Sequence, residues 1–209
     1  MGVPLSLEQL QQALTENLSK DALYDLLSSY EDEACQQFTP GAITGDAKVL
    51  TAYYSSFLFS HLLIDEIQEA RALTQRIPST LIQNEPVVQR SIAILRSIYQ
   101  NKFSETYALL RGQPWPKPVD IVVERFDAYY TEKSFRNISR IYESIRPEVA
   151  AEYLGLQNNA ELTDILVKRG WEWNAEKELF RPHVPDEHVA RKVRPPLDQI
   201  SRTVGLASV

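Results

Sequence analysis

The residues of this chain that could bind a metal ion or attack a substrate are few and far apart. The histidines are His61, His183 and His188, and the single cysteine is Cys35. A zinc site needs several histidine, cysteine or carboxylate ligands at close spacings, and the sequence has neither a His-x-His nor a His-Glu-x-x-His pattern. The spacing from His183 to His188 suits neither one face of a helix nor one face of a strand. The sequence therefore predicts no metal site.

Nucleophilic catalysis and phosphate binding also lack their usual signatures. Cys35 falls on a predicted helix with no histidine within one turn, so no base is placed to remove its thiol proton. No Gly-x-Ser-x-Gly turn and no glycine-rich phosphate loop occurs. Acidic clusters within residues 31–33 and 65–69 suit solvated helix faces, and Asp65 lies one turn after His61, a common local pair. We expect no cofactor and no enzymatic activity.

The composition argues against two classes of partner. Of the 209 residues, 44% are hydrophobic and 24% charged, which is ordinary for a globular protein with a buried core. The formal net charge of -6 opposes binding to nucleic acid, which depends on neutralising phosphates. The most apolar stretch, residues 49–64, is shorter than the ~20 residues that cross a bilayer. We expect a soluble chain that binds neither nucleic acid nor membranes.

The N-terminus and the cysteine content fit the same expectation. The first residues contain no basic segment followed by an apolar run, so they do not resemble a secretory signal. Gly2 and Ser6 match the loose myristoylation pattern, but no basic cluster follows, and Ser6 suits a helix cap better. One cysteine cannot form an internal disulfide, which favours a reducing compartment.

Helical periodicity dominates the first two thirds of the chain. Ser6 and Gln9 have capping-box spacing, and Ser19 is expected to cap a second helix that ends near Phe38. Prolines and glycines then delimit helices expected over residues 46–62, 65–76, 86–100, 104–110 and 118–142, the last with a kink near 133. Short loops between them predict antiparallel helix pairs, a mainly α helical-repeat region of residues 1–145.

The pattern changes after residue 145. A short helix over residues 147–154 ends at Gly155, and a second helix is expected from an Asn158 cap to the glycine stop at Gly170. Residues 171–173 and 179–181 then alternate as two strands around a polar turn. The order helix, helix, β-hairpin predicts a winged-helix subdomain in residues 146–182.

A winged helix can bind DNA or protein, and the sequence favours protein. Its second helix would enter the major groove led by Glu161 and Asp164, whose charges oppose phosphates. The edge of the hairpin could instead pair with the sheet of a neighbouring protein. Large apolar side chains would enlarge that interface, although at least one tryptophan could pack on the subdomain's own helices. The expected interface residues of the hairpin are Trp171, Trp173, Leu179 and Phe180.

The last segment, residues 183–209, is expected to be a proline-rich linker followed by a short C-terminal helix. Leu197, Ile200 and Val204 have helical spacing and form an apolar stripe. So short a helix is marginal alone in water. We therefore expect it to dock on helices of a partner and to become ordered there.

The order of these elements resembles the PCI-domain family, found in the proteasome lid, the COP-nine signalosome and translation initiation factor three. Within it, the chain resembles the smallest signalosome subunits over roughly residues 49–182. The helices of residues 6–38 do not match the family pattern, and the tail ends soon after Leu197, where the family has a longer C-terminal helix. The segments that carry the resemblance are Glu69–Pro78 with its Arg-Ile-Pro end, Gln100–Phe103, Tyr107–Leu110 with Trp115, Phe135–Ile145, Ala150–Leu156 and Arg169–Trp171.

The resemblance implies a function by assembly. The signalosome removes a ubiquitin-like modifier from the cullins of cullin–RING ubiquitin ligases, and its zinc protease is another subunit with a His-x-His motif. Absence of that motif here implies a non-catalytic scaffold in the cytoplasm and nucleus, with other PCI-domain subunits as partners. A subunit of the proteasome lid or of the initiation factor is the alternative, and a winged-helix DNA-binding protein is a third.

Overall fold

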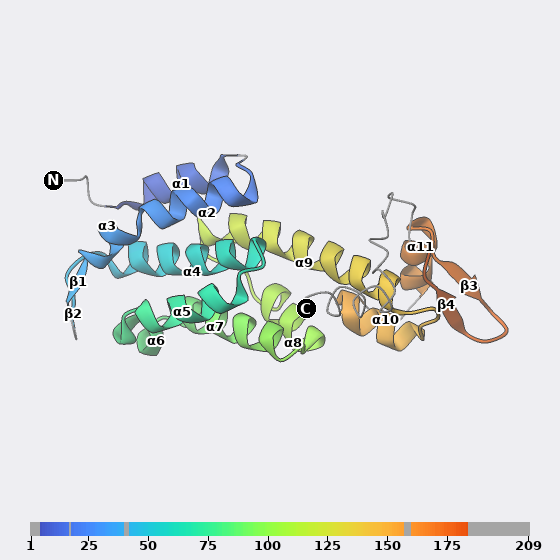
Figure 1. Ribbon diagram of the computed structural model, residues 1–209. Coiled ribbons are helices and arrows are strands. Elements are labelled where there is room, and N and C mark those ends of the chain that lie inside the picture. The colour runs from blue at the N-terminus through green and yellow to red at the C-terminus, as the bar shows by residue number, and fades with distance from the viewer. Residues whose placement is uncertain (1–4, 17, 40–41, 157–159, 184–209) are drawn as a thin grey trace, which may run out of the picture.

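The structure, a computed structural model, describes residues 5–16, 18–39, 42–156 and 160–183. It is mostly helical, with two short β-hairpins (Figure 1). None of the helices in these residues has the length and apolar character needed to cross a membrane. The helices are α1 (Leu7–Thr15), α2 (Lys20–Ser29), α3 (Glu31–Cys35), α4 (Ala47–Leu63), α5 (Ile67–Arg76), α6 (Ser79–Asn84), α7 (Pro86–Tyr99), α8 (Phe103–Arg111), α9 (Val119–Ile141), α10 (Pro147–Leu154) and α11 (Ala160–Lys168). The strands are β1 (Phe38–Thr39), β2 (Ala42–Ile43), β3 (Glu172–Asn174) and β4 (Leu179–Arg181).

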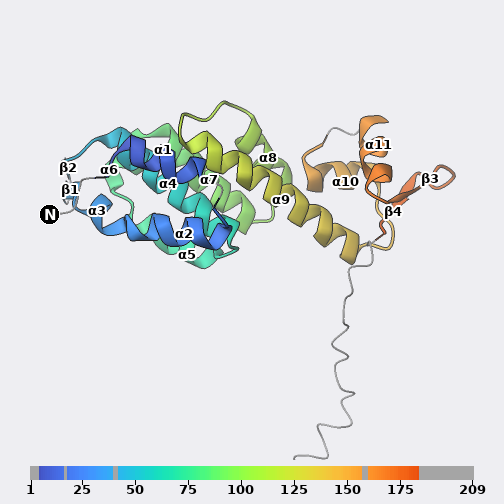
Figure 2. The ribbon, with the colours of Figure 1, turned by 90° about the horizontal axis from the view of Figure 1, so that it is seen from above.

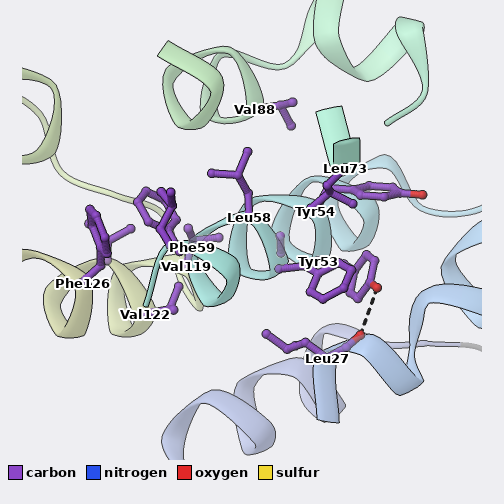
Figure 3. Close-up of a cluster of buried hydrophobic side chains, with 14 of the residues drawn as sticks. Leu27, Tyr53, Tyr54, Leu58, Phe59, Leu73, Val88, Val119, Val122 and Phe126 are labelled. Carbon is purple, nitrogen blue, oxygen red and sulfur yellow. Dashed lines mark hydrogen bonds between the residues drawn. The ribbon is translucent and has the colours of Figure 1, made fainter. Parts of the chain in front are cut away.

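Helix α4 is the centre of the larger hydrophobic core. Its side chains are buried all the way from Val49 to Leu63, as expected of a helix that is apolar on every side. In Figure 1, α1 and α2 lie on one side of α4, and α5 and α7 lie on the other. Figure 3 shows Tyr53 of α4 reaching α2, where its hydroxyl donates to the Leu27 carbonyl at 3.0 Å. The neighbouring helices therefore pack around α4 rather than in a single layer.

The predicted caps at the N-terminus are confirmed, but the second helix is shorter than expected. Ser6 and Gln9 form the reciprocal capping box, and the Ser19 hydroxyl accepts from the Ala22 N–H at 3.1 Å. Helix α2 ends at Ser29, whose own hydroxyl donates to a carbonyl one turn back. Such a side-chain bond, together with the tight turn at Tyr30, competes with the backbone hydrogen bonds that would continue the helix. The residues predicted to form the last part of this helix instead form α3 and the first strand of the β1–β2 hairpin, neither of which was predicted from the sequence.

The helices expected from residue 46 to residue 142 are present. Each lies within a few residues of its predicted bounds, and α9 runs through Lys133 as one uninterrupted helix. The additional helix α6, just after Pro78, was not anticipated. The two helices expected after residue 145 are present as α10 and α11. The two strands expected after them are present as the β3–β4 hairpin. The Asn158 cap and the C-terminal helix lie outside the described residues.

A second, smaller hydrophobic cluster forms beyond the larger one. Helix α9 joins the two, since Tyr130 belongs to the first cluster and Phe135 to the second. Figure 2 shows α9 extending from the helical region toward α10 and α11. The buried members of the second cluster are Phe135, Ile138, Ile145, Ala150, Ala151, Leu154, Leu162, Leu166, Trp171 and Phe180.

The two clusters meet where α10 packs on α8 and α9. Gly155 ends α10 in the left-handed conformation, with φ +60°, and the next N–H bonds back to the Ala151 carbonyl at 3.0 Å. This is the Schellman arrangement, which favours glycine. Tyr107 of α8 lies directly against Gly155 and donates from its hydroxyl to the Tyr153 carbonyl at 3.3 Å. Arg111 donates to the Gly155 carbonyl at 2.8 Å, so this glycine lies in the contact between the two clusters.

Replacing Gly155 with alanine should therefore destabilise the chain. An added Cβ would lie 2.2 Å from the Tyr107 ring and would occupy a left-handed position. Backbone strain and overpacking together should lower the free energy of unfolding by about 2–4 kcal/mol. Urea denaturation measures the change.

Gly170→Ala is the matched control, because Gly170 also has a positive φ, +93°, but no atom lies within 4 Å of the added Cβ. It should cost only backbone strain, about 1–2 kcal/mol. Equal losses for the two variants would show that the Tyr107 contact contributes nothing.

Candidate protein–protein interface

The residues that could do chemistry remain separate in the structure. Among the residues described, no three histidine, cysteine, aspartate or glutamate side chains come together in a way that could hold a metal ion. Cys35 is a free cysteine at the end of α3. Desolvation raises the pKa of its thiol, which favours the protonated, unreactive form.

His61 is buried in the larger core rather than paired with Asp65. Its ring lies 4.6 Å from the Phe57 ring and 5.0 Å from the Tyr24 ring, centroid to centroid. Neither ring nitrogen has a hydrogen-bond partner in the described part of the chain. Burial, with a contribution from the charge of Arg76, lowers the pKa of His61 to about 4. His61 is therefore a neutral core residue at physiological pH.

The expected pairing of Asp65 with His61 is wrong, because Asp65 turns away from α4. Asp65 has φ +66° at the turn after the helix, which directs its carboxylate toward α9. There the carboxylate accepts from the Tyr129 hydroxyl at 2.6 Å and pairs with the Lys133 ammonium. Asp65 thus ties the α4–α5 turn to α9, a structural role.

The hairpin of the second cluster has one covered edge and one open edge. Strands β3 and β4 pair antiparallel, with Trp173 opposite Phe180. On its other side Phe180 exchanges both backbone hydrogen bonds with Ile145, each at 2.9 Å. Strand β4 is therefore the middle of a three-stranded arrangement. Strand β3 is at its margin and pairs with β4 alone among the described residues.

The direction of the backbone groups on β3 follows from this pairing. In an antiparallel ladder, successive residues of a strand direct their N–H and C=O to alternate sides. Phe180 directs both its N–H and its C=O to Ile145, so it makes no backbone hydrogen bond with Trp173. The hydrogen-bonded pairs of the hairpin are therefore the two neighbouring pairs of the register. By the same alternation, Trp173 directs its own N–H and C=O outward. An added strand would meet one donor and one acceptor at this residue.

The side chains around this edge offer apolar area. Trp173 is 37% exposed and rests on the Phe180 ring, with 4.7 Å between ring centroids. Leu179, which precedes Phe180 on β4, is half-buried. A hollow of about 440 Å³ lies along the hairpin, lined by both strands, their turn and Ser144. An approaching strand would therefore find both open backbone groups and a partly exposed indole.

Trp171 and Phe180, also expected at the interface, lie in the core instead. Trp171 is 2% exposed and Phe180 is 0% exposed. The Trp171 ring stacks on Phe135 at 5.3 Å, and its Nε1 donates to the Ser139 hydroxyl at 3.0 Å. Trp171 is therefore the tryptophan that packs on the subdomain's own helices, the alternative that the sequence left open. The reason is that Trp171 precedes β3 and belongs to the end of α11.

That end of α11 is a second Schellman motif. The Trp171 N–H bonds to the Leu166 carbonyl at 3.0 Å, and the Gly170 N–H bonds to the Val167 carbonyl at 2.9 Å. This motif commonly places an apolar residue after the glycine against the last helical turn. A glycine stop followed by tryptophan was the sequence signal that could have assigned Trp171 to the core.

Three apolar side chains, at the end of α9 and on α11, are exposed, and the sequence did not predict this exposure. Ile141 at the end of α9 is 72% exposed, and Ile165 and Val167 of α11 are 39% and 48% exposed. Helical periodicity would place each of them in an apolar stripe of its helix. The other predicted interface residues, Leu197, Ile200 and Val204, lie outside the described residues.

The comparisons with known proteins agree on one family. A family model described as CSN8/PSMD8/EIF3K family matches residues 48–192. A protein named COP9 signalosome complex subunit 8, from Emericella nidulans, is 40% identical over 182 residues, which is 86% of this chain and 84% of the relative. Proteins of the same name from Arabidopsis thaliana and Danio rerio are 25% and 22% identical, over 60% and 77% of this chain and 64% and 84% of their own.

The buried state of His61 predicts a pH-dependent stability. Its pKa is about 4 in the folded protein against 6.5 ordinarily, so the unfolded chain binds the extra proton first as the pH falls. This contribution to stability is complete above pH 6.5 and is lost as the pH falls toward 4. Between pH 8 and pH 5 the loss should be about 2 kcal/mol. Urea unfolding at a series of pH values, compared with His61→Leu, measures it.

The exposed His183 supplies the control, since His183→Leu should leave the pH dependence as it is in the wild type. A His61→Leu protein that retains the full loss of stability between pH 8 and pH 5 would show that another group is responsible.

Proposed function

From the premise that the chain belongs to the CSN8/PSMD8/EIF3K family, we propose that it is a non-catalytic assembly subunit of the COP9 signalosome. In that role it supports the deneddylation of cullin–RING ubiquitin ligases, in the cytoplasm and the nucleus. The observation that carries the assembly role is the open β3 edge, where the Trp173 backbone groups point away from the hairpin. Other PCI-domain subunits are the partners.

The relatives favour the signalosome over the other complexes of the family. The family description joins three kinds of subunit, but six curated relatives that match this chain are each named COP9 signalosome complex subunit 8. A proteasome-lid or initiation-factor subunit remains the alternative. Co-purification of the tagged chain followed by mass spectrometry distinguishes the complexes, because each would yield a different set of subunits.

We further propose that α10, α11 and the β3–β4 hairpin form a winged helix that binds protein rather than DNA. The order of elements supports this, as does the strand-like pairing of Ile145 with Phe180. Of the exposed residues on α11, Asp164 is acidic, Ile165 and Val167 are apolar, and Lys168 in the last turn is the one basic residue among those described. Such a helix lacks the concentrated positive charge that phosphate contacts require.

Replacing Trp173 should weaken assembly while leaving the fold intact. Trp173→Asp puts a carboxylate where the proposed partner strand would bury it, which costs several kcal/mol, about 2–5, if it stays unpaired. Trp173→Pro removes the outward N–H, which an edge strand tolerates in the free chain but an added strand would need. Reconstitution with the other signalosome subunits, followed by size-exclusion chromatography, measures the yield of complex.

Ile165→Asp is the matched control, since Ile165 is 39% exposed in the same subdomain but lies on α11. It should assemble normally. Wild-type yield of complex from both Trp173 variants, at unchanged melting temperature, would exclude the β3 edge. Loss of assembly in Ile165→Asp alone would place the interface on α11.

The non-catalytic role predicts the behaviour of the isolated chain. Purified chain should bind no stoichiometric zinc and should not cleave a neddylated cullin, because its histidines are not arranged as a ligand set in the described residues. Metal analysis and a deneddylation assay test this. One tightly held zinc per chain, or cleavage by the chain alone, would contradict the proposal.

A further inference from the structure

A narrow groove lies between α5 and α7, in the helical region and away from the hairpin. Figure 1 places these two helices on the side of α4 opposite α1 and α2, in the helical half of the molecule and away from β3. The groove has a volume of about 220 Å³, enough for a side chain rather than a domain surface. Its lining residues are Arg71, Thr74, Ile92, Leu95, Arg96 and Tyr99.

The floor of the groove is apolar and one wall is an exposed aromatic ring. Leu95 is buried and Ile92 is half-buried, so the bottom offers hydrocarbon. Tyr99, at the end of α7, is 52% exposed although the rest of that helix buries its apolar face. An exposed tyrosine beside an apolar floor is typical of contact surfaces rather than of solvated helix ends.

The two arginines of the groove differ from those that stabilise the fold. Arg76 and Arg111 pair with carboxylates at 2.6 Å and 2.8 Å, and Arg90 donates to carbonyls at the end of α8 and in the loop after it. Arg71 and Arg96 make no ion pair with any described residue. Among the described residues, no carboxylate lines the groove either, although the chain as a whole is acidic.

One of these guanidinium groups is already held in position. Arg71 donates to the Gln68 Oε1 at 3.3 Å, and its guanidinium lies 4.9 Å from the centre of the Tyr99 ring. Such stacking orients a guanidinium without using most of its N–H donors. Those donors remain available to a carboxylate, which can accept two of them at once.

We propose that this groove binds an acidic segment of a partner protein that inserts one leucine or phenylalanine side chain between α5 and α7. The apolar side chain covers Ile92 and Leu95, and flanking carboxylates pair with Arg71 and Arg96. Charge complementarity selects this occupant, since a basic segment would be repelled by two unpaired guanidinium groups. The proposal is separate from the role of the β3 edge and does not depend on it.

A peptide-binding experiment on the purified full chain tests the inference. The probe is fluorescein-labelled Glu-Glu-Leu-Glu-Glu-Phe-Glu-Glu, and fluorescence anisotropy at physiological salt measures its affinity. Wild-type protein should bind it saturably, and Arg71→Glu or Arg96→Glu should weaken binding by at least about tenfold. Arg140→Glu, a charge reversal at an exposed arginine of α9, is the matched control and should bind like wild type.

Two further peptides separate the groove from general electrostatic attraction. Replacing leucine and phenylalanine by glycine keeps the charge and should weaken binding, and replacing the glutamates by lysines should abolish it. No binding of the first probe up to about 1 mM, equal binding to all arginine variants, or equal binding of the glycine peptide overturns the proposal. So does a dimer in sedimentation that Arg96→Glu dissolves, since the groove would then hold a second copy of the chain.

Discussion

The fold depends on the burial of α4 on every side. A helix that is apolar around its whole circumference cannot be stable at a surface, so neighbours must cover each of its faces. Figure 3 shows residues of α2, α5, α7 and α9 converging on it, among them Leu27, Leu73, Val88 and Phe126. The antiparallel arrangement of these helices follows from that requirement together with their short connections.

Helix α9 transfers the rigidity of this core to the C-terminal hairpin. Its first half packs on α4 and its second half enters the smaller cluster, so one helix fixes both ends. Ser139 holds the indole of Trp171, and Trp171 and Phe135 in turn support Phe180 on β4. An edge strand carried on such a support is already oriented, which lowers the entropic cost of pairing with another strand.

Local signals predicted most of the fold, whereas the surface of the site depended on tertiary packing. Capping at Ser6 and Ser19 and the helix stop at Gly155 are decided by a few neighbouring residues, and the sequence predicted each correctly. The position of Trp173 at an open edge depends instead on the pairing of β4 with Ile145 on its other side, which leaves β3 as the outer strand. The exposure of Ile141 likewise depends on which helices reach the end of α9, which periodicity cannot show.

The two proposed surfaces would divide the work of recognition differently. Pairing along β3 uses backbone groups that every protein possesses, so it can supply affinity but little discrimination among partners. Discrimination must come from side chains, through contacts that fit one partner and repel others. A doubly cationic groove on an acidic chain has that property, because its charge differs in sign from most of the surface around it. Since the groove lies in the helical half of the molecule, away from the β3 edge, one partner segment could occupy each without excluding the other.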